Sequence, residues 1–168
     1  PPRMMRGVAK KGREPMTTDV NIESLISDVE EVVARGIAYV QDNAESEVKI
    51  DIWTPREVLC HWIYWHAVTA EGMETAAAGE GPHRIFAEVD DMNSRSVGRK
   101  SGVSVAWLVE EMEELQERLI AAARAMPDPN AVVVAPGDGS EASGVQRLET
   151  IVSHWNEHLE EMAAAASA

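Results

Sequence analysis

The chain has a single cysteine, Cys60, and no apolar run long enough to cross a membrane. One cysteine cannot form an intrachain disulfide, so nothing indicates an oxidising compartment and we expect a cytoplasmic protein. No apolar core of signal-peptide length follows the basic amino terminus, and we expect no membrane partner. A nucleotide site is not supported either, because Gly137-Asp138-Gly139 lacks the lysine and the strand-to-helix setting of a phosphate loop.

Positive charge is also scarce. The 168 residues include 15 Lys and Arg against 29 Asp and Glu, a formal net charge of -14 at pH 7. Residues 1–15 hold five basic residues and one acid, so the remainder carries 10 basic against 28 acidic residues, or -18. Such a surface repels phosphate backbones, and we expect no nucleic-acid partner. We expect 1–15 to be a disordered basic tail and 16–165 to form one domain.

Apolar residues recur at helical spacing in four segments, which predicts an all-α protein built as a four-helix bundle. The predicted helix starts are Thr17, Thr18 or Asp19, then Thr54, then Ser101 or Ser104, and finally Ser143. The second and fourth helices open with capping boxes that pair Thr54 with Glu57 and Ser143 with Gln146. The apolar stripe of the first helix could also serve a homodimer interface, although the bundle itself uses it.

Two connections, 79–100 and 127–142, are longer than the links of a simple up-down bundle. Residues 86–93 in the first are predicted to form a short extra helix before the third long one. Residues 131–135 in the second are rich in valine and could be strand-like, although the sequence reveals no partner strand. Long loops of this kind often carry functional residues.

Histidines provide the strongest candidate for a functional site. His154 and His158 stand four residues apart in a helical segment, which places them on one face with β-carbons roughly 5–6 Å apart. The pair borders the apolar stripe of its helix, and His61 has the same position beside the stripe of its own helix. Three imidazoles facing one pocket are typical of a metal site that keeps a position open. The alternative is a set of core-edge histidines that are hydrogen-bonded to neighbours.

Other residues near these histidines have simpler explanations. Glu57, one turn before His61, is a candidate for orienting that ring and lining the pocket, but the capping box accounts for it. Cys60 is turned about 100° from His61, which predicts a buried apolar role. We expect His66 and His83 at the surface. Tryptophans at helical spacing are predicted to pack in the core or to frame a cavity for a flat ligand, namely Trp62, Trp65, Trp107 and Trp155. A metalloprotease is disfavoured, because its motif needs a glutamate where Trp155 stands.

A tryptophan, a capped helix start and an inward histidine follow one another in Trp53-Thr54-Pro55-Arg56-Glu57-Val58-Leu59-Cys60-His61. This stretch resembles the second-helix signature of the DinB/YfiT-like superfamily. The family's pair of metal ligands, four residues apart, falls on His154 and His158. Val89-Asp90-Asp91-Met92-Asn93 resembles an Asp-x-x-Asn element of some branches, which makes Asn93 a pocket candidate. The resemblance spans roughly Met16 to Met162 and implies a bundle with a divalent metal, zinc or nickel, held by three side chains.

The branches of this superfamily imply different chemistry. The bacillithiol-transferase branch often has a His-Arg-Gly-Gln run after the last ligand, where this chain has Leu159-Glu160-Glu161-Met162. The mycothiol-dependent isomerase branch often places a glutamate at the position of His154, and a third branch of small resistance proteins is metal-free. We expect a metal-dependent enzyme that adds a low-molecular-weight thiol to an electrophilic small molecule. A metal-dependent hydrolase and a metal-free small-molecule binding protein are the alternatives.

Overall fold

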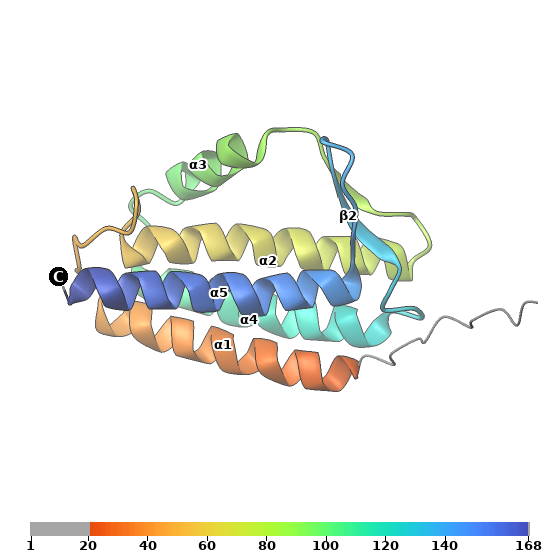
Figure 1. Cartoon of the computed structure of the whole chain (residues 1–168), viewed down its shortest axis with the longest axis horizontal. Coiled ribbons are helices and arrows are strands. Elements are labelled where there is room, and N and C mark those ends of the chain that lie inside the picture. Colours follow the sequence, from red (N-terminus) through yellow and green to blue (C-terminus); the bar gives the residue numbers. More distant parts are fainter. Residues whose placement is uncertain (1–20, 168) are drawn as a thin grey trace, which may run out of the picture.

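The computed structural model describes residues 21–167, which form five helices and a small three-stranded sheet (Figure 1). The four long helices are α1 (Ile22–Asp42), α2 (Pro55–Ala77), α4 (Val105–Ala125) and α5 (Gly144–Ala166). They lie side by side, with α2 and α4 running in one direction and α1 and α5 in the other (Figure 1). The predicted all-α four-helix bundle is therefore confirmed. The predicted tail at 1–15 and the predicted helix start at Thr17–Asp19 lie outside the described residues.

Local capping chemistry sets where the helices begin. The Thr54 N–H donates to Glu57 Oε2 at 2.8 Å and Thr54 Oγ1 accepts from the Glu57 N–H, which forms the predicted capping box of α2. The same reciprocal pair, Ser143 with Gln146, opens α5. Ser104, one of the two predicted starts, caps α4 by accepting from the Trp107 N–H. Such caps typically contribute about 1 kcal/mol each.

The long connection after α2 carries the predicted extra helix, α3 (Val89–Arg99), which crosses the outer side of α2 (Figure 1). The valine-rich segment of the second connection is β2 (Val132–Pro136), and it has two partners that the sequence did not reveal. β1 (His83–Ile85) pairs with it in parallel, and β3 (Ala142–Ser143) pairs with it antiparallel. The partners have three and two residues, too short for an alternating apolar pattern to appear.

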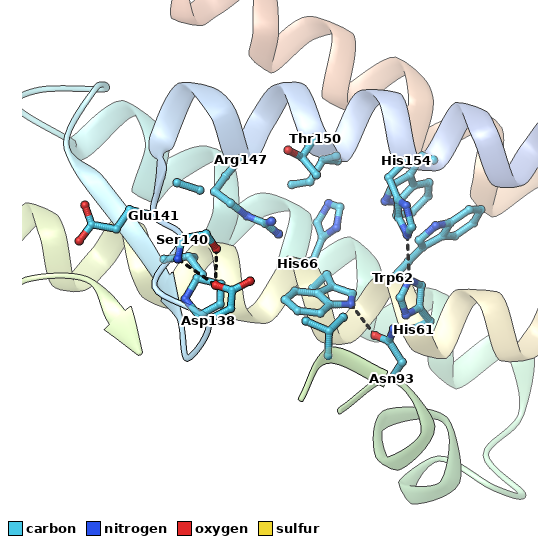
Figure 2. A pocket seen from close by; sticks show the side chains of 17 residues that line it. His61, Trp62, His66, Asn93, Asp138, Ser140, Glu141, Arg147, Thr150 and His154 are labelled. Atoms are coloured by element: carbon cyan, nitrogen blue, oxygen red, sulfur yellow. Dashed lines mark hydrogen bonds between the residues drawn. The ribbon is translucent and has the colours of Figure 1, made fainter. Parts of the chain in front are cut away.

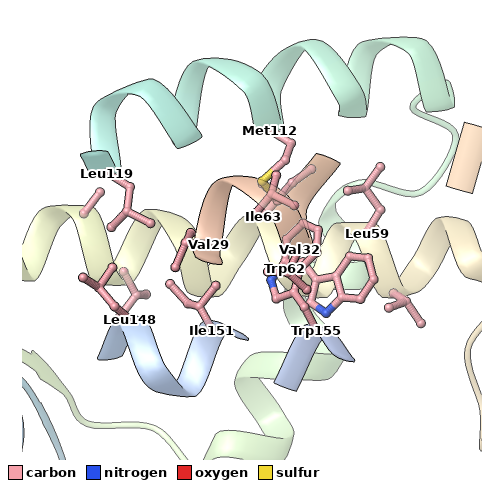
Figure 3. Packing of buried hydrophobic residues seen from close by; sticks show 14 of the residues in the cluster. Val29, Val32, Leu59, Trp62, Ile63, Met112, Leu119, Leu148, Ile151 and Trp155 are labelled. Carbon is pink, nitrogen blue, oxygen red and sulfur yellow. The ribbon is translucent and has the colours of Figure 1, made fainter. Parts of the chain in front are cut away.

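Two tryptophans and a glycine fix how α5 is rotated against the bundle. Trp62 of α2 and Trp155 of α5 stack in the core, with ring centroids 3.9 Å apart and planes 8° from parallel (Figure 3). Gly36 of α1 leaves the room for them, since a Cβ there would lie 2.5 Å from Trp155 Cζ3. Because Trp155 is held inside, His154 and His158 on its flank are turned toward α2.

Two predictions about exposure were wrong. His66 is completely buried rather than at the surface, because α2 is the central helix and is covered by α4, α5, α3 and the sheet. Trp107, predicted to pack in the core or to frame a cavity, is 69% exposed, because α4 turns the neighbouring Leu108 and Val109 inward instead. Cys60 is buried, as predicted, and His83 is half-buried in β1, with Nδ1 3.3 Å from Glu71 Oε1. No helix of the described part is both long and apolar enough to cross a membrane.

Candidate metal centre

The structure brings His61, His154 and His158 together between α2 and α5. One ligand nitrogen from each ring can be chosen so that all three lie within 4.8 Å of one another. The Nε2 atoms of His61 and His154 face each other at 2.8 Å, a separation at which they share one proton (Figure 2). The rings of His154 and His158 are 4.4 Å apart between centroids. This three-histidine cluster could hold a metal ion.

Burial keeps two of these rings neutral. Burial first, and then the neighbouring His154 and His158, lower the pKa of His61 to about 3, while Asn93 acts in the opposite direction. Burial, followed by His158 and Arg147, lowers the pKa of His154 to about 4. Both rings are therefore neutral at neutral pH, and each has one nitrogen with a free lone pair. To bind one cation through both Nε2 atoms, the proton that they share would have to move to an Nδ1 atom.

Two nitrogens of the three-histidine cluster are buried without a hydrogen-bond partner among the described residues, His61 Nδ1 and His158 Nε2. A purely structural cluster would pair such atoms, because leaving one buried and unpaired costs about 1–3 kcal/mol. A cation bound at His158 Nε2 would remove this penalty. The unpaired nitrogen is therefore compatible with a bound cation, although His66 Nδ1 and Gln116 Nε2, outside the cluster, are also buried without a partner among the described residues.

Glu161, which the sequence did not mark as a site residue, orients His158. Its Oε2 atom lies 2.9 Å from His158 Nδ1, three residues away on α5. An acceptor at Nδ1 holds the proton there and leaves the lone pair on Nε2, the tautomer that a metal ligand requires. The i, i+3 spacing of a glutamate after a histidine was the available signal, but an acidic helix face offers many such pairs.

Replacing Glu161 with Gln is expected to weaken divalent-metal binding about tenfold. This is a small effect for a residue that hydrogen-bonds to a metal ligand, and we expect it to be small because the Glu161 carboxylate is exposed. The measurement is a competition titration of the metal against a chromogenic chelator. Glu160→Gln is the matched control, since it removes the same charge from the neighbouring exposed position. Equal affinities of the two variants would mean that Glu161 does not orient His158.

Two members of the three-histidine cluster, His61 and His154, line one end of a pocket of about 360 Å³, large enough for a small molecule (Figure 2). His158 is not among the residues that line it. Helices α2, α3 and α5 and the segment from β2 to β3 form its walls. Most of its exposed surface is apolar, although nine of the seventeen lining residues have polar or charged side chains. The residues that line it are His61, Trp62, Trp65, His66, Val89, Asn93, Val134, Pro136, Asp138, Ser140, Glu141, Ala142, Arg147, Thr150, Ile151, His154 and Trp155.

Two of the three predicted pocket candidates line this pocket. The Trp65 Nε1–H donates to Asn93 Oδ1 at 2.9 Å, which ties α3 to α2 beside His61 (Figure 2). Glu57, the third candidate, does not line the pocket, because its carboxylate is engaged in the capping box with Thr54. Trp53 packs against the three-histidine cluster, with its ring centroid 4.9 Å from that of His61.

His66 is a pocket residue that the sequence interpretation missed. Its Nε2 atom lies 2.9 Å from Gln116 Oε1 of α4, and its ring meets Trp155 edge to face. Burial lowers its pKa to about 4, so it is neutral at physiological pH. Its spacing of five residues from His61 correctly indicated that the two side chains point in different directions. The His66 side chain points into the bundle, however, and not to solvent.

The fold and the three-histidine cluster define a four-helix bundle with a candidate metal centre beside a small-molecule pocket. A family model described as the DinB superfamily matches residues 38–162, and this chain belongs to that superfamily. The match covers the capped start of α2 and all three histidines. No curated protein and no solved structure matches the chain.

Proposed function

We propose that the protein is a divalent-metal-dependent enzyme that adds a low-molecular-weight thiol to an electrophilic small molecule. His61, His154 and His158 would hold a zinc or nickel ion. The observation that carries the proposal is the convergence of three imidazoles, two of which have a buried nitrogen without a hydrogen-bond partner among the described residues, beside a mainly apolar pocket that His61 and His154 line. Three protein ligands leave at least one coordination position for a substrate, which separates catalytic from closed structural sites.

A divalent cation held there would supply Lewis acidity, which lowers the pKa of a thiol or of water toward neutrality. The chain's own residues contribute orientation and an apolar wall. Glu161 fixes the tautomer of His158, and burial keeps His61 and His154 neutral. The stacked, buried pair Trp62 and Trp155 forms an apolar part of the pocket wall.

The positions of the carboxylates favour thiol addition over hydrolysis. Hydrolysis needs a general base within hydrogen-bond reach of the attacking water, usually a carboxylate or a histidine. The acids that line the pocket, Asp138 and Glu141, lie at the end away from His61 and His154 (Figure 2). The third acid nearby, Glu161, is engaged with His158. A thiol loses its proton much more readily than water does, so thiol addition depends less on a general base.

The test loads tag-free protein with zinc or with nickel and follows its reaction with 1-chloro-2,4-dinitrobenzene and a panel of thiols, including cysteine, coenzyme A, bacillithiol and mycothiol. We expect metal-dependent thioether formation with at least one thiol, and its loss in His158→Ala. His83→Ala, a histidine outside the three-histidine cluster, is the matched control and should remain active. Hydrolysis of 4-nitrophenyl acetate without any thiol transfer would instead assign a hydrolase. A protein that takes up no metal would be a metal-free binding protein.

A further inference from the structure

A second functional group lies in the same pocket, at a distance from the histidines. Arg147 projects from the second turn of α5, and its guanidinium carbon is 5.5 Å from the centroid of the Trp65 ring. Its Nε and Nη2 atoms donate to Thr69 Oγ1 at 3.2 and 3.0 Å. Nη1 forms no hydrogen bond with any described residue and is not sealed from solvent, so a molecule in the pocket can reach it.

Arg147 is half-buried and has no carboxylate partner. Three of the ten Lys and Arg side chains of the described part do pair with a carboxylate, in Lys100–Glu111, Arg118–Glu74 and Arg124–Glu23. No described carboxylate oxygen lies within 4 Å of Arg147, although Asp138 and Glu141 line the same pocket. A partly buried charge is unfavourable unless it is paired. The position therefore calls for an anion that comes from outside the chain.

Burial lowers the pKa of Arg147 to about 10, and no acidic group opposes that effect. The side chain remains a cation at neutral pH. Asp138 and Glu141 are exposed on the loop between β2 and β3, where solvent and salt screen their charge. They leave Arg147 free to bind a ligand anion within the pocket.

The spacing along α5 relates Arg147 to the three-histidine cluster. Arg147 and His154 are seven residues apart, two helical turns or about 10 Å, and both point into the pocket from the same side of α5 (Figure 2). Trp65 and Ile151 lie along the wall between them. Away from the histidines, the pocket therefore holds Arg147 with the acids Asp138 and Glu141 beyond it, while His61 and His154 lie at the other end. The flat ring of Trp65 forms part of the wall.

We propose that the electrophilic substrate is an organic anion, with a carboxylate that binds Arg147 and a flat apolar body that packs along Trp65 toward the histidines. The guanidinium offers paired donors in the geometry that a carboxylate matches. This inference rests on the proposed function in one respect, because it calls the bound anion a substrate. Binding of the anion at Arg147 does not itself require the metal. The carboxylate is assigned to the electrophile rather than to the thiol because a small thiol acid has no flat body to pack along the Trp65 ring.

The experiment titrates metal-free, tag-free protein with phenylacetate and with phenylacetamide, which share a shape and differ in charge, and follows tryptophan fluorescence and heat. We expect phenylacetate to bind at least about tenfold more tightly than the amide, because only the carboxylate can form a hydrogen bond between two charged groups with Arg147. 3-Mercaptopropionate, a thiol acid without the flat body, should bind more weakly than phenylacetate. Equal affinities for acid and amide, or no binding of phenylacetate, would overturn the proposal. Preferential binding of the thiol acid would overturn its assignment to the electrophile.

Two variants locate the anion site. Arg147→Met keeps most of the side-chain volume without the charge and should bind the acid no better than the amide, whereas Arg147→Lys should retain the preference. Arg124→Met is the matched control, because it removes the same charge from an exposed position on α4. Unchanged phenylacetate affinity in Arg147→Met would contradict the assignment. Metal content is measured separately, on each protein after incubation with zinc or nickel: a wild type that takes up no metal would refute the proposed function while the anion result stands.

Discussion

Replacing His61 with alanine is expected to reduce the metal content of the purified, tag-free protein from one ion per chain to nearly none. His61 is the one member of the three-histidine cluster on α2, so its loss leaves two ligands on a single helix. If a site worth about 10–16 kcal/mol divides its binding energy among four ligands, each contributes roughly 3–4 kcal/mol, a loss of two to three orders of magnitude in affinity. Elemental analysis after incubation with zinc or nickel is the measurement.

The control for this experiment is His83→Ala, because it removes a histidine that belongs to no cluster. His61 is buried, so its replacement also leaves a cavity, and circular dichroism with urea unfolding must establish that the variant is folded. His158→Ala, at a more exposed position, gives the same test with less disturbance of the core. Full metal content in a folded His61→Ala or His158→Ala protein would refute the three-histidine centre.

Replacing Gly72 with alanine is expected to destabilise the protein by about 2–3 kcal/mol, near the upper end for overpacking. A Cβ at Gly72 would collide with the backbone carbonyl oxygen of Val133 in β2. Backbone held in a sheet cannot turn aside as a side chain would, so either α2 or β2 must move. Urea unfolding followed by circular dichroism measures the change, and the shift in midpoint should occur without a change in slope.

Gly98→Ala is the matched control for Gly72→Ala. Gly98 is also helical, but a Cβ there would meet nothing within 4 Å. Its replacement should stabilise α3 by about 0.5–1 kcal/mol, because glycine is the poorer helix former. If Gly72→Ala proves as harmless as Gly98→Ala, then β2 is not held tightly against α2. The wall of the pocket would then be looser than the structure implies.

Both proposals place function along one face of α5. His154 and His158 would hold a metal and Arg147 would hold the anionic end of a substrate, while Trp155 between these positions fixes the rotation of the helix. The two ends can be tested separately, because the three-histidine cluster and Arg147 share no hydrogen bond. Loss of the metal and loss of anion binding should therefore be largely separate effects, linked through the charge of Arg147, which helps to lower the pKa of His154.

Much of the helical framework could be predicted because its signals are local. The capping boxes at Thr54 and Ser143 gave two helix starts, since each is a reciprocal hydrogen-bond pair over four residues. The pairing of His154 with His158 followed from helical geometry alone. That His61 would join them was inferred from its place beside an apolar stripe and from family resemblance, and the structure brings the three together.

The remaining features depended on contacts between distant segments. Tertiary packing decides the direction of His66, the exposure of Trp107 and the strand partners of β2. Local periodicity does not show which helices and strands pack against one another. Arg147 looked like any exposed cation of an amphipathic helix, because a single sequence does not show that the β2–β3 segment encloses that face. The sequence by itself determined the helices, their caps and the histidine pair, since these depend on neighbours within one or two turns. Only the tertiary structure decided the pocket, the pairing of Glu161 with His158 and the unpaired charge of Arg147, since burial depends on residues far apart in the chain.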